Sequence, residues 1–354
     1  MRLRLVVLAL AALAGCDAAD DAPTLADVPA DRRVAFVAVY DETTADGAPV
    51  HRVVVADIED PTVFEVISRP DHFSVSPHLS RDGQQVLFGD RTIGPVSAVQ
   101  YVRYDLRTGR ADTLGHVPPG GEVARPILVG LGSPVVWERD GRGFYFTNPT
   151  PPFSIKQDVL RFRFADGYFE RVHDSGSYAT TVIGMKGPDS LVVFSVSPEA
   201  PGWTPERPAG IFLMDLKGQL VRRAQNPNLS YVAAGGLRTQ AFTEATVNEE
   251  RGLIASIWAE LRPGTMSDYD VSLAVSDLDG RYFQTYGLDS TYLNWHPRWG
   301  PGKTVLFERE PRGGADWRLH RAMVLDLETG SIRELADPAI YGAGGTRMPS
   351  AGSR

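Results

Sequence analysis

The chain has 354 residues, of which 43% are hydrophobic and 23% are charged, and its formal net charge is −8 at pH 7. This composition is that of a globular protein, and the acidic balance argues against nucleic acid or an anionic lipid surface as the main partner. The single cysteine, Cys16, excludes an internal disulfide bond and a cysteine-based metal site. The 35 glycines and 26 prolines indicate many turns.

Residues 1–15 are typical of a secretory signal, because a basic start at residues 1–4 precedes the apolar run 5–13, which is too short to cross a bilayer. Leu13-Ala-Gly-Cys16 resembles the lipobox of bacterial lipoproteins. This resemblance implies cleavage before Cys16 and attachment of a lipid to its sulfur. The alternative is an ordinary signal peptide with a coincidental cysteine. Residues 16–32 are acidic, small and proline-containing, which predicts a flexible tether.

From Arg33 onward, short apolar runs alternate with Gly, Pro, Asp and Asn and show almost no helical period, which predicts an all-β fold. Two landmarks recur in alternation. The first is a turn followed by an apolar run, as in Asp82-Gly-Gln-Gln-Val-Leu-Phe88. The second is an apolar run followed by a turn, as in Tyr101-Val-Arg-Tyr-Asp-Leu-Arg-Thr-Gly109. Each recurs six times at intervals of roughly 50–60 residues, so one repeat contains four strands, A to D.

This repeat predicts a six-bladed β-propeller of four-stranded antiparallel blades over residues 33–350. A lone meander leaves edges and apolar faces exposed, whereas radial blades cover one another. Two stacked sheets are the alternative. The expected blades are residues 33–68, 72–116, 121–174, 176–225, 229–287 and 290–336. The first blade lacks a clear strand A, which either residues 22–26 or, as we prefer, a C-terminal segment within residues 340–350 would supply.

Two segments carry a family resemblance. Ser76-Pro-His-Leu-Ser-Arg-Asp-Gly83 and Trp295-His-Pro-Arg-Trp-Gly-Pro-Gly-Lys303 resemble the W-S-P-D-G-K motif of WD40-like PD40 repeats in TolB-like propellers. The resemblance spans roughly residues 33–350 and implies the six-bladed propeller fold. It is weaker at Lys186-Gly-Pro-Asp189 and is lost at Asn248-Glu-Glu-Arg-Gly252. We expect no counterpart of the TolB N-terminal α/β domain, so the Tol-system partners are not carried over.

The B–C and D–A connections are longer than the tight A–B and C–D turns and lie on the opposite face of the expected disc, where binding loops are common. Four aromatic residues of the B–C loops form a candidate binding face, with packing against the blade rim as the alternative. They are Phe153, Trp203, Tyr269 and Trp317. Four more aromatic residues near the starts of strand A either ring the channel mouth or pack between blades. They are Phe73, Tyr178, Tyr231 and Tyr292.

We recognise no catalytic motif, since the nucleophile elbow, the His-Glu-x-x-His pair and the phosphate-binding loop are all missing from the sequence. His72, His116 and His173 are expected to be exposed loop residues rather than ligands of an axial ion. We therefore predict no catalytic residue, no metal and no other cofactor. Glu249 is expected to be solvated in its turn, and the hairpin at residues 76–88 is expected to be purely architectural.

We therefore expect a bacterial cell-envelope lipoprotein, anchored in the membrane through Cys16 and facing the periplasm or the cell exterior. Its propeller is predicted to be a non-enzymatic scaffold for an envelope protein or for a glycan or peptide ligand. The alternative is a propeller enzyme of the polysaccharide lyase or hydrolase type, with acid and base groups in the central funnel. The oligomeric state and the choice between inner and outer membrane are left open.

Overall fold

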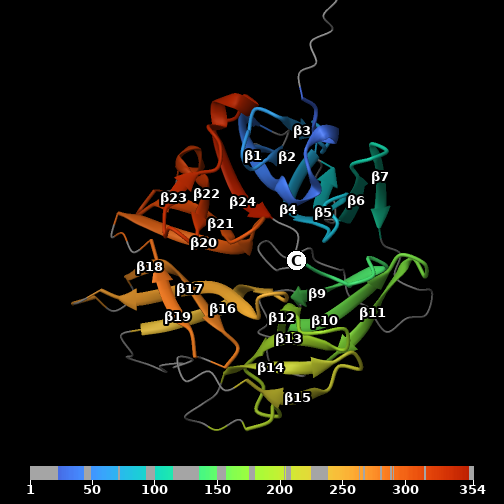
Figure 1. Ribbon diagram of the computed structural model, residues 1–354, viewed down its shortest axis with the longest axis vertical. Coiled ribbons are helices and arrows are strands. Elements are labelled where there is room, and N and C mark those ends of the chain that lie inside the picture. The colour runs from blue at the N-terminus through green and yellow to red at the C-terminus, as the bar shows by residue number, and fades with distance from the viewer. Residues whose placement is uncertain are drawn as a thin grey trace, which may run out of the picture.

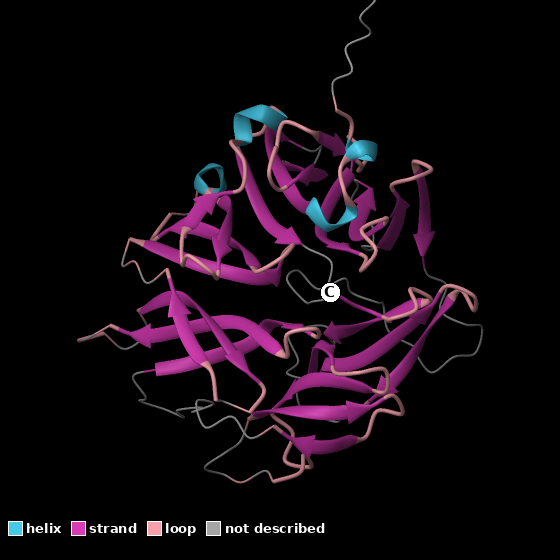
Figure 2. Cartoon of the chain, viewed as in Figure 1, coloured by secondary structure: helices cyan, strands magenta, loops and turns pink. Residues whose placement is uncertain are grey.

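A computed structural model of the chain describes residues 23–350 except 44–48, 71, 93–99, 115–134, 150–156, 175–179, 203, 205–208, 225–237, 263, 266–267, 280, 288, 290 and 315. Strands dominate this part of the chain, with a few short 3₁₀ helices (Figure 2). The sheets are arranged around a common centre (Figure 1). No helix of the described residues is long and apolar enough to cross a membrane.

Four of the sheets contain four strands each. The first has the order β24 (Gly345–Ser350), β1 (Arg33–Thr43), β2 (Pro49–Asp57), β3 (Phe64–Val66). The second has the order β4 (His72–Leu79), β5 (Gln85–Thr92), β6 (Gln100–Asp105), β7 (Arg110–Leu114). The third contains β8 (Val135–Trp137), β9 (Gly143–Pro149), β10 (Gln157–Arg163), β11 (Tyr168–His173). The fourth contains β12 (Thr180–Met185), β13 (Ser190–Ser195), β14 (Gly210–Asp215), β15 (Leu220–Arg223).

The remaining sheet has eight strands and joins two antiparallel meanders. The first meander contains β16 (Arg238–Asn248), β17 (Leu253–Leu261), β18 (Tyr269–Asp277) and β19 (Phe283–Tyr286). The second contains β20 (Tyr292–Trp299), β21 (Thr304–Pro311), β22 (Arg321–Asp326) and β23 (Ile332–Glu334). One parallel pairing, Val271 with Leu293, links β18 to β20. Every other strand pairing of the described residues is antiparallel, as the repeat predicts.

The pairing of β24 with β1 joins the two ends of the described chain. Gly345 pairs with Val39 and Thr346 with Ala38, so that β24 takes the position of the missing strand A in the first sheet. Thr346 also ties β24 to the neighbouring meander, because its hydroxyl accepts a 2.7 Å hydrogen bond from the Ala322 backbone N–H. The ring of sheets is therefore closed through backbone hydrogen bonds between distant segments.

The N-terminal segment packs on the ring before β1 begins. It forms the 3₁₀ helices η1 (Leu25–Asp27) and η2 (Ala30–Arg32). Leu25 and Val28 are buried in the apolar cluster between the first and second sheets, and the Arg33 guanidinium donates hydrogen bonds to the Val28 and Gly83 carbonyls. The predicted boundary of the flexible tether at residue 32 is therefore wrong, because these apolar side chains cover an edge that would otherwise face water.

Buried apolar side chains gather between neighbouring four-strand units. The cluster between the second and third sheets is aromatic and includes Trp137, Phe144 and Phe162. Another cluster, which includes Trp299 and Phe307, packs the two meanders of the eight-stranded sheet against each other. Because each unit covers the apolar face of the next, the tight turns that end the innermost strands are held around the centre of the ring.

Candidate functional site

Turns from three different sheets meet near the centre of the ring. The turn between β4 and β5 carries Arg81, the turn between β8 and β9 carries Arg139, and the turn between β16 and β17 carries Glu249. Arg81 donates a hydrogen bond to Glu249 Oε2, and Arg139 Nη2 lies 2.6 Å from Glu249 Oε1. The sheet of β12–β15 separates the third sheet from β16 along the ring, so these ion pairs bridge turns that are not neighbours.

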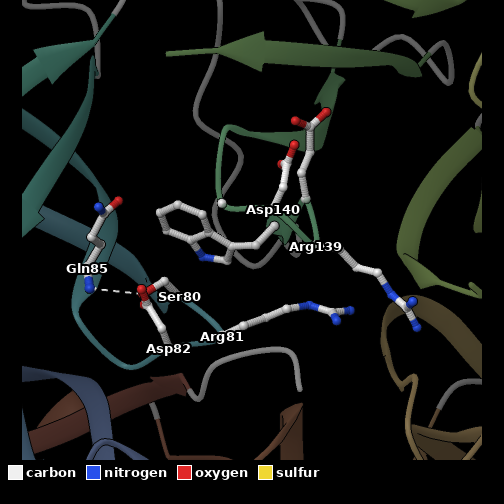
Figure 3. Close-up of a pocket in the computed structure, with 9 residues that line it drawn as sticks. Ser80, Arg81, Asp82, Gln85, Arg139 and Asp140 are labelled. Atoms are coloured by element: carbon white, nitrogen blue, oxygen red, sulfur yellow. Dashed lines mark hydrogen bonds between the residues drawn. The ribbon is translucent and has the colours of Figure 1, made fainter. Parts of the chain in front are cut away.

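The β4–β5 turn satisfies its own polar groups and leaves Arg81 to project. Gly83 has a φ of 64°, which an L-residue adopts with strain. The Ser80 hydroxyl donates a 2.6 Å hydrogen bond to Asp82 and accepts a 2.9 Å bond from the Gln85 backbone N–H. In Figure 3, the Arg81 and Arg139 side chains extend in the same direction, away from the Ser80–Asp82 hairpin.

Glu249 is a buried carboxylate, since only 5% of its side chain is exposed. Burial acts to raise the pKa of this carboxyl, but the hydrogen bonds and charges of Arg81 and Arg139 outweigh burial and hold the pKa below its ordinary value. The three side chains together carry one net positive charge. The centre of this face is therefore a preorganised, slightly basic cluster.

A pocket of about 240 Å³ opens between the β4–β5 and β8–β9 turns. It is lined by Ser80, Arg81, Asp82, Gln85, Trp137, Glu138, Arg139, Asp140 and Gly141. Trp137 is only 1% exposed, and its indole Nε1 has no hydrogen-bond partner among the described residues. The pocket volume lies below the roughly 300–1,000 Å³ of most small-molecule sites, so it suits a group the size of one or two side chains.

The pocket is lined by two arginines and three carboxylates. Glu138 is neutralised by Arg161, and the Asp82 and Asp140 carboxylates accept hydrogen bonds within their own turns. Arg81 and Arg139 line the pocket and supply its guanidinium donors, whereas the Trp137 indole nitrogen is buried from solvent. Such donors match a carboxylate in geometry and charge.

Two predictions about this face are wrong. Glu249 is not solvated, and the hairpin of residues 76–88 lines a pocket in addition to shaping a blade. The sequence around Glu249 does not reveal that its counter-ions, Arg81 and Arg139, come from turns of two other sheets. The sequence does contain one signal for the site, because Arg81 and Arg139 occupy the same place in two Arg-Asp-Gly turns, at residues 81–83 and 139–141.

Five of the predicted site residues lie outside the described residues. They are Cys16, Phe153, Tyr178, Trp203 and Tyr231.

The two described aromatic residues of the predicted binding face are both half-buried. The Tyr269 carbonyl accepts a 2.8 Å hydrogen bond from Arg312 Nη2, and Trp317, in η3 (Trp317–Leu319), has the Arg318 guanidinium 5.1 Å from its ring centroid. Each of these contacts fits a packing role as well as a binding role. Their assignment to a binding face stays a prediction.

The two described residues of the predicted channel mouth have different surroundings. Phe73 stacks on the His51 ring with 4.2 Å between centroids. Tyr292 is 38% exposed, and the Arg309 guanidinium lies 5.3 Å from its ring centroid. The Arg312 backbone N–H donates to the Thr291 carbonyl next to Tyr292, while the Arg312 guanidinium binds the Tyr269 carbonyl. Arg312 thus links the start of β18, at Tyr269, to the start of β20, at Tyr292.

The histidines of the D–A connections have partners of their own. His72 is buried rather than exposed, because it begins strand β4, and its Nδ1 lies 2.5 Å from Asp90 Oδ2. His173 Nδ1 lies 2.7 Å from the Gly218 carbonyl, and His116 lies outside the described residues. Within the described part of the chain, one set of side chains converges closely enough to hold a metal ion, namely Glu308, Glu310 and His320.

We predict that Glu249→Gln lowers the free energy of unfolding at pH 7 by about 1.5–3 kcal/mol, because two guanidinium groups lose their charged acceptor. The folded-state pKa of Glu249 is depressed, so its contribution is complete above its unfolded pKa and is lost as the pH falls through the folded pKa. The difference from the wild type should therefore be constant between pH 7 and about 5 and shrink at lower pH. Urea unfolding at a series of pH values measures this.

Glu250→Gln is the matched control, since Glu250 is the exposed neighbour of Glu249 and should leave stability unchanged. Equal effects of the two substitutions, or a Glu249→Gln effect that does not change with pH, would contradict the ion-pair cluster.

No protein-family model matches the chain, and no curated protein matches it significantly. Solved structures share its fold. TolB from Acinetobacter baumannii aligns with a TM-score of 0.59 at 16% identity, over 90% of this chain and 66% of that chain. A putative TolB from Agrobacterium tumefaciens aligns with a TM-score of 0.53 at 14% identity, over 86% of this chain and 89% of that chain.

The β-propeller domain of the Trilobed protease from Pyrococcus furiosus aligns with a TM-score of 0.51 at 11% identity, over 86% of this chain and 95% of that domain. At these identities the similarity concerns the fold. Together with the antiparallel four-stranded sheets around a common centre, it shows that the chain has a TolB-like β-propeller fold.

Proposed function

We propose that this chain is a non-enzymatic binding scaffold of the cell envelope, anchored through a lipid on Cys16. Its central pocket takes an acidic group of a protein or peptide partner. The observation that carries the proposal is the pocket between the β4–β5 and β8–β9 turns, which two arginines border at the centre of the ring.

We infer that this propeller has six blades. The eight-stranded sheet joins its two meanders through one parallel pairing, and a buried apolar cluster lies between them. Such a cluster between faces is the packing of two neighbouring blades. The two meanders and the four other sheets then make six repeats of four strands, the number that the sequence repeat predicts.

The pocket suits a side chain or a chain terminus of a partner better than a cofactor or a sugar chain. About 240 Å³ holds one or two side chains. Arg81 and Arg139 are already held in place by Glu249, so a ligand carboxylate would meet donors whose ordering cost is largely met before binding. An acidic side chain or a C-terminal carboxylate fits both the size and the charge.

The lining of the pocket favours binding over catalysis. The Ser80 hydroxyl is used within its turn, and the residues that line the pocket include no histidine or cysteine. The Glu138 carboxylate is engaged in an ion pair with Arg161. A lyase or hydrolase would need a nucleophile or an acid and base pair at this place.

We expect Arg139→Ala to abolish capture of the partner from the native envelope. Half of the Arg139 side chain is exposed, so the guanidinium is accessible to a ligand. The experiment compares wild-type protein and variants as bait in detergent-solubilised envelope, with quantitative mass spectrometry of the captured proteins. A partner of this site is a protein that is enriched by the wild type and depleted at least tenfold with Arg139→Ala.

Arg142→Ala is the matched control, because Arg142 lies three residues further along and 84% of its side chain is exposed. This variant should retain the partner. A set of captured proteins that is the same for both variants would rule out the pocket as the binding site.

If the lipid is attached to Cys16, the substitution Cys16→Ser should abolish incorporation of radiolabelled palmitate. It should also release the protein from the membrane fraction. The sulfur is the acceptor of the lipid in this proposal, and Cys16 is the single cysteine of the chain. Ala18→Ser is the control and should keep both the label and the membrane location. A Cys16→Ser protein that is still labelled would contradict the anchor.

A further inference from the structure

A second group of polar side chains lies on and beside β21, among residues that do not line the pocket. Glu308 and Glu310 are alternate residues of β21 and therefore face the same side of the sheet. In the antiparallel pairing of β21 with β22, Glu308 lies opposite Ala322 and Arg309 lies opposite Arg321. Continuing this register by one residue places His320 beside Glu310. The ligand atoms of Glu308, Glu310 and His320 all lie within 4.8 Å of one another.

The group is largely buried and places two carboxylates at one imidazole. Glu308 is 1% exposed and His320 is 5% exposed. Glu308 contacts Nδ1 of His320, and Glu310 Oε2 lies 3.2 Å from Nε2 of the same ring. A neutral imidazole has one N–H and cannot donate to both carboxylates. A cation bound between the two carboxylates and the imidazole would compensate part of their charge.

A second imidazole from another strand approaches the same carboxylate. His296, on β20, has its Nε2 3.9 Å from Glu308 Oε2. This separation is longer than a hydrogen bond. It is a few tenths of an ångström beyond the distance of about 3.3–3.6 Å between two tetrahedral donors that bind one ion through bonds of about 2.0–2.2 Å. Strands β20 and β21 and the residue before β22 thus direct nitrogen and oxygen donors toward one place.

The surroundings resemble the outer shell of a metal site. The Trp295 indole N–H donates a 2.9 Å hydrogen bond to Glu310 Oε1, which fixes that carboxylate and leaves its other oxygen for an ion.

We propose that Glu308, Glu310 and His320 bind one divalent transition-metal ion, with His296 as the fourth ligand. Two carboxylates balance the charge of the ion when both imidazoles are neutral. Mixed nitrogen and oxygen donors without sulfur suit Zn²⁺ or Mn²⁺, whereas Ca²⁺ and Mg²⁺ prefer oxygen ligands alone. The ion would fasten the start of β22 beside β24, because the Thr346 backbone N–H donates to the His320 carbonyl. The site is therefore structural and stabilises the closure of the ring.

The test is a titration of the full chain, stripped with EDTA, with ZnCl₂ and separately with MnCl₂, MgCl₂ and CaCl₂. Isothermal calorimetry should give one Zn²⁺ or Mn²⁺ per chain and no comparable site for Mg²⁺ or Ca²⁺. At a free metal concentration of about one hundred times Kd, the melting temperature should rise by about 5 °C. Glu310→Gln keeps the shape of the side chain and should weaken binding at least tenfold and abolish the shift.

Two further variants keep the result decisive. His296→Ala removes a ligand that is partly exposed, so it tests the site if Glu310→Gln has lost its circular-dichroism spectrum. Glu334→Gln, on β23 outside the group, should bind as the wild type does. Absence of binding to the wild type would overturn the proposal. Binding that is equal in Glu310→Gln, His296→Ala and Glu334→Gln would overturn it as well.

Discussion

The backbone pairing of β24 with β1 is the constraint on which the rest of the structure depends. It joins the last described strand of the chain to the first, and it completes a sheet that would otherwise lack its innermost strand. Closing so long a loop costs chain entropy, which the packing of every other unit must offset. Once the ring is closed, each unit buries the apolar face of the next, and no unit can move outward alone.

The closed ring determines what its centre can do. Turns that are far apart in sequence are held close enough for Arg81 and Arg139 to share the Glu249 carboxylate. That carboxylate orients both guanidinium groups while it neutralises only one of their two charges. Because the turns and their arginines are already ordered, binding of a ligand carboxylate costs less conformational entropy. Closure of the ring thus preorganises the proposed binding site at its centre.

The fold could be predicted in large part because its signals are local. Alternating apolar runs, Asp-Gly turns and the repeat of two landmarks indicate four-stranded antiparallel units without knowledge of distant contacts. The resemblance of residues 76–83 and 295–303 to PD40 repeats points to the propeller. The packing of Leu25 and Val28 was missed because composition alone identified that segment as a tether, although each residue is apolar and occurs beside a short turn.

The candidate site was missed for a different reason. Glu249 looks like a charged turn residue until the ring places two arginines from other sheets around it, and His72 looks like a loop residue until β4 begins at that position. Burial and pairing of charged groups depend on contacts between distant segments. The repeated Arg-Asp-Gly at residues 81–83 and 139–141 was the one local sign, and it gains meaning only when two copies are superimposed in space.

The central claim is that the partner binds at the pocket between the tight turns rather than at the long loops of the other face. Hydrogen–deuterium exchange of the full chain, with and without the captured partner, tests it most directly. We predict slower exchange in the turns at residues 80–85, 138–142 and 249–252. Protection confined to the long connections, at residues 262–268 and 312–320, would contradict it.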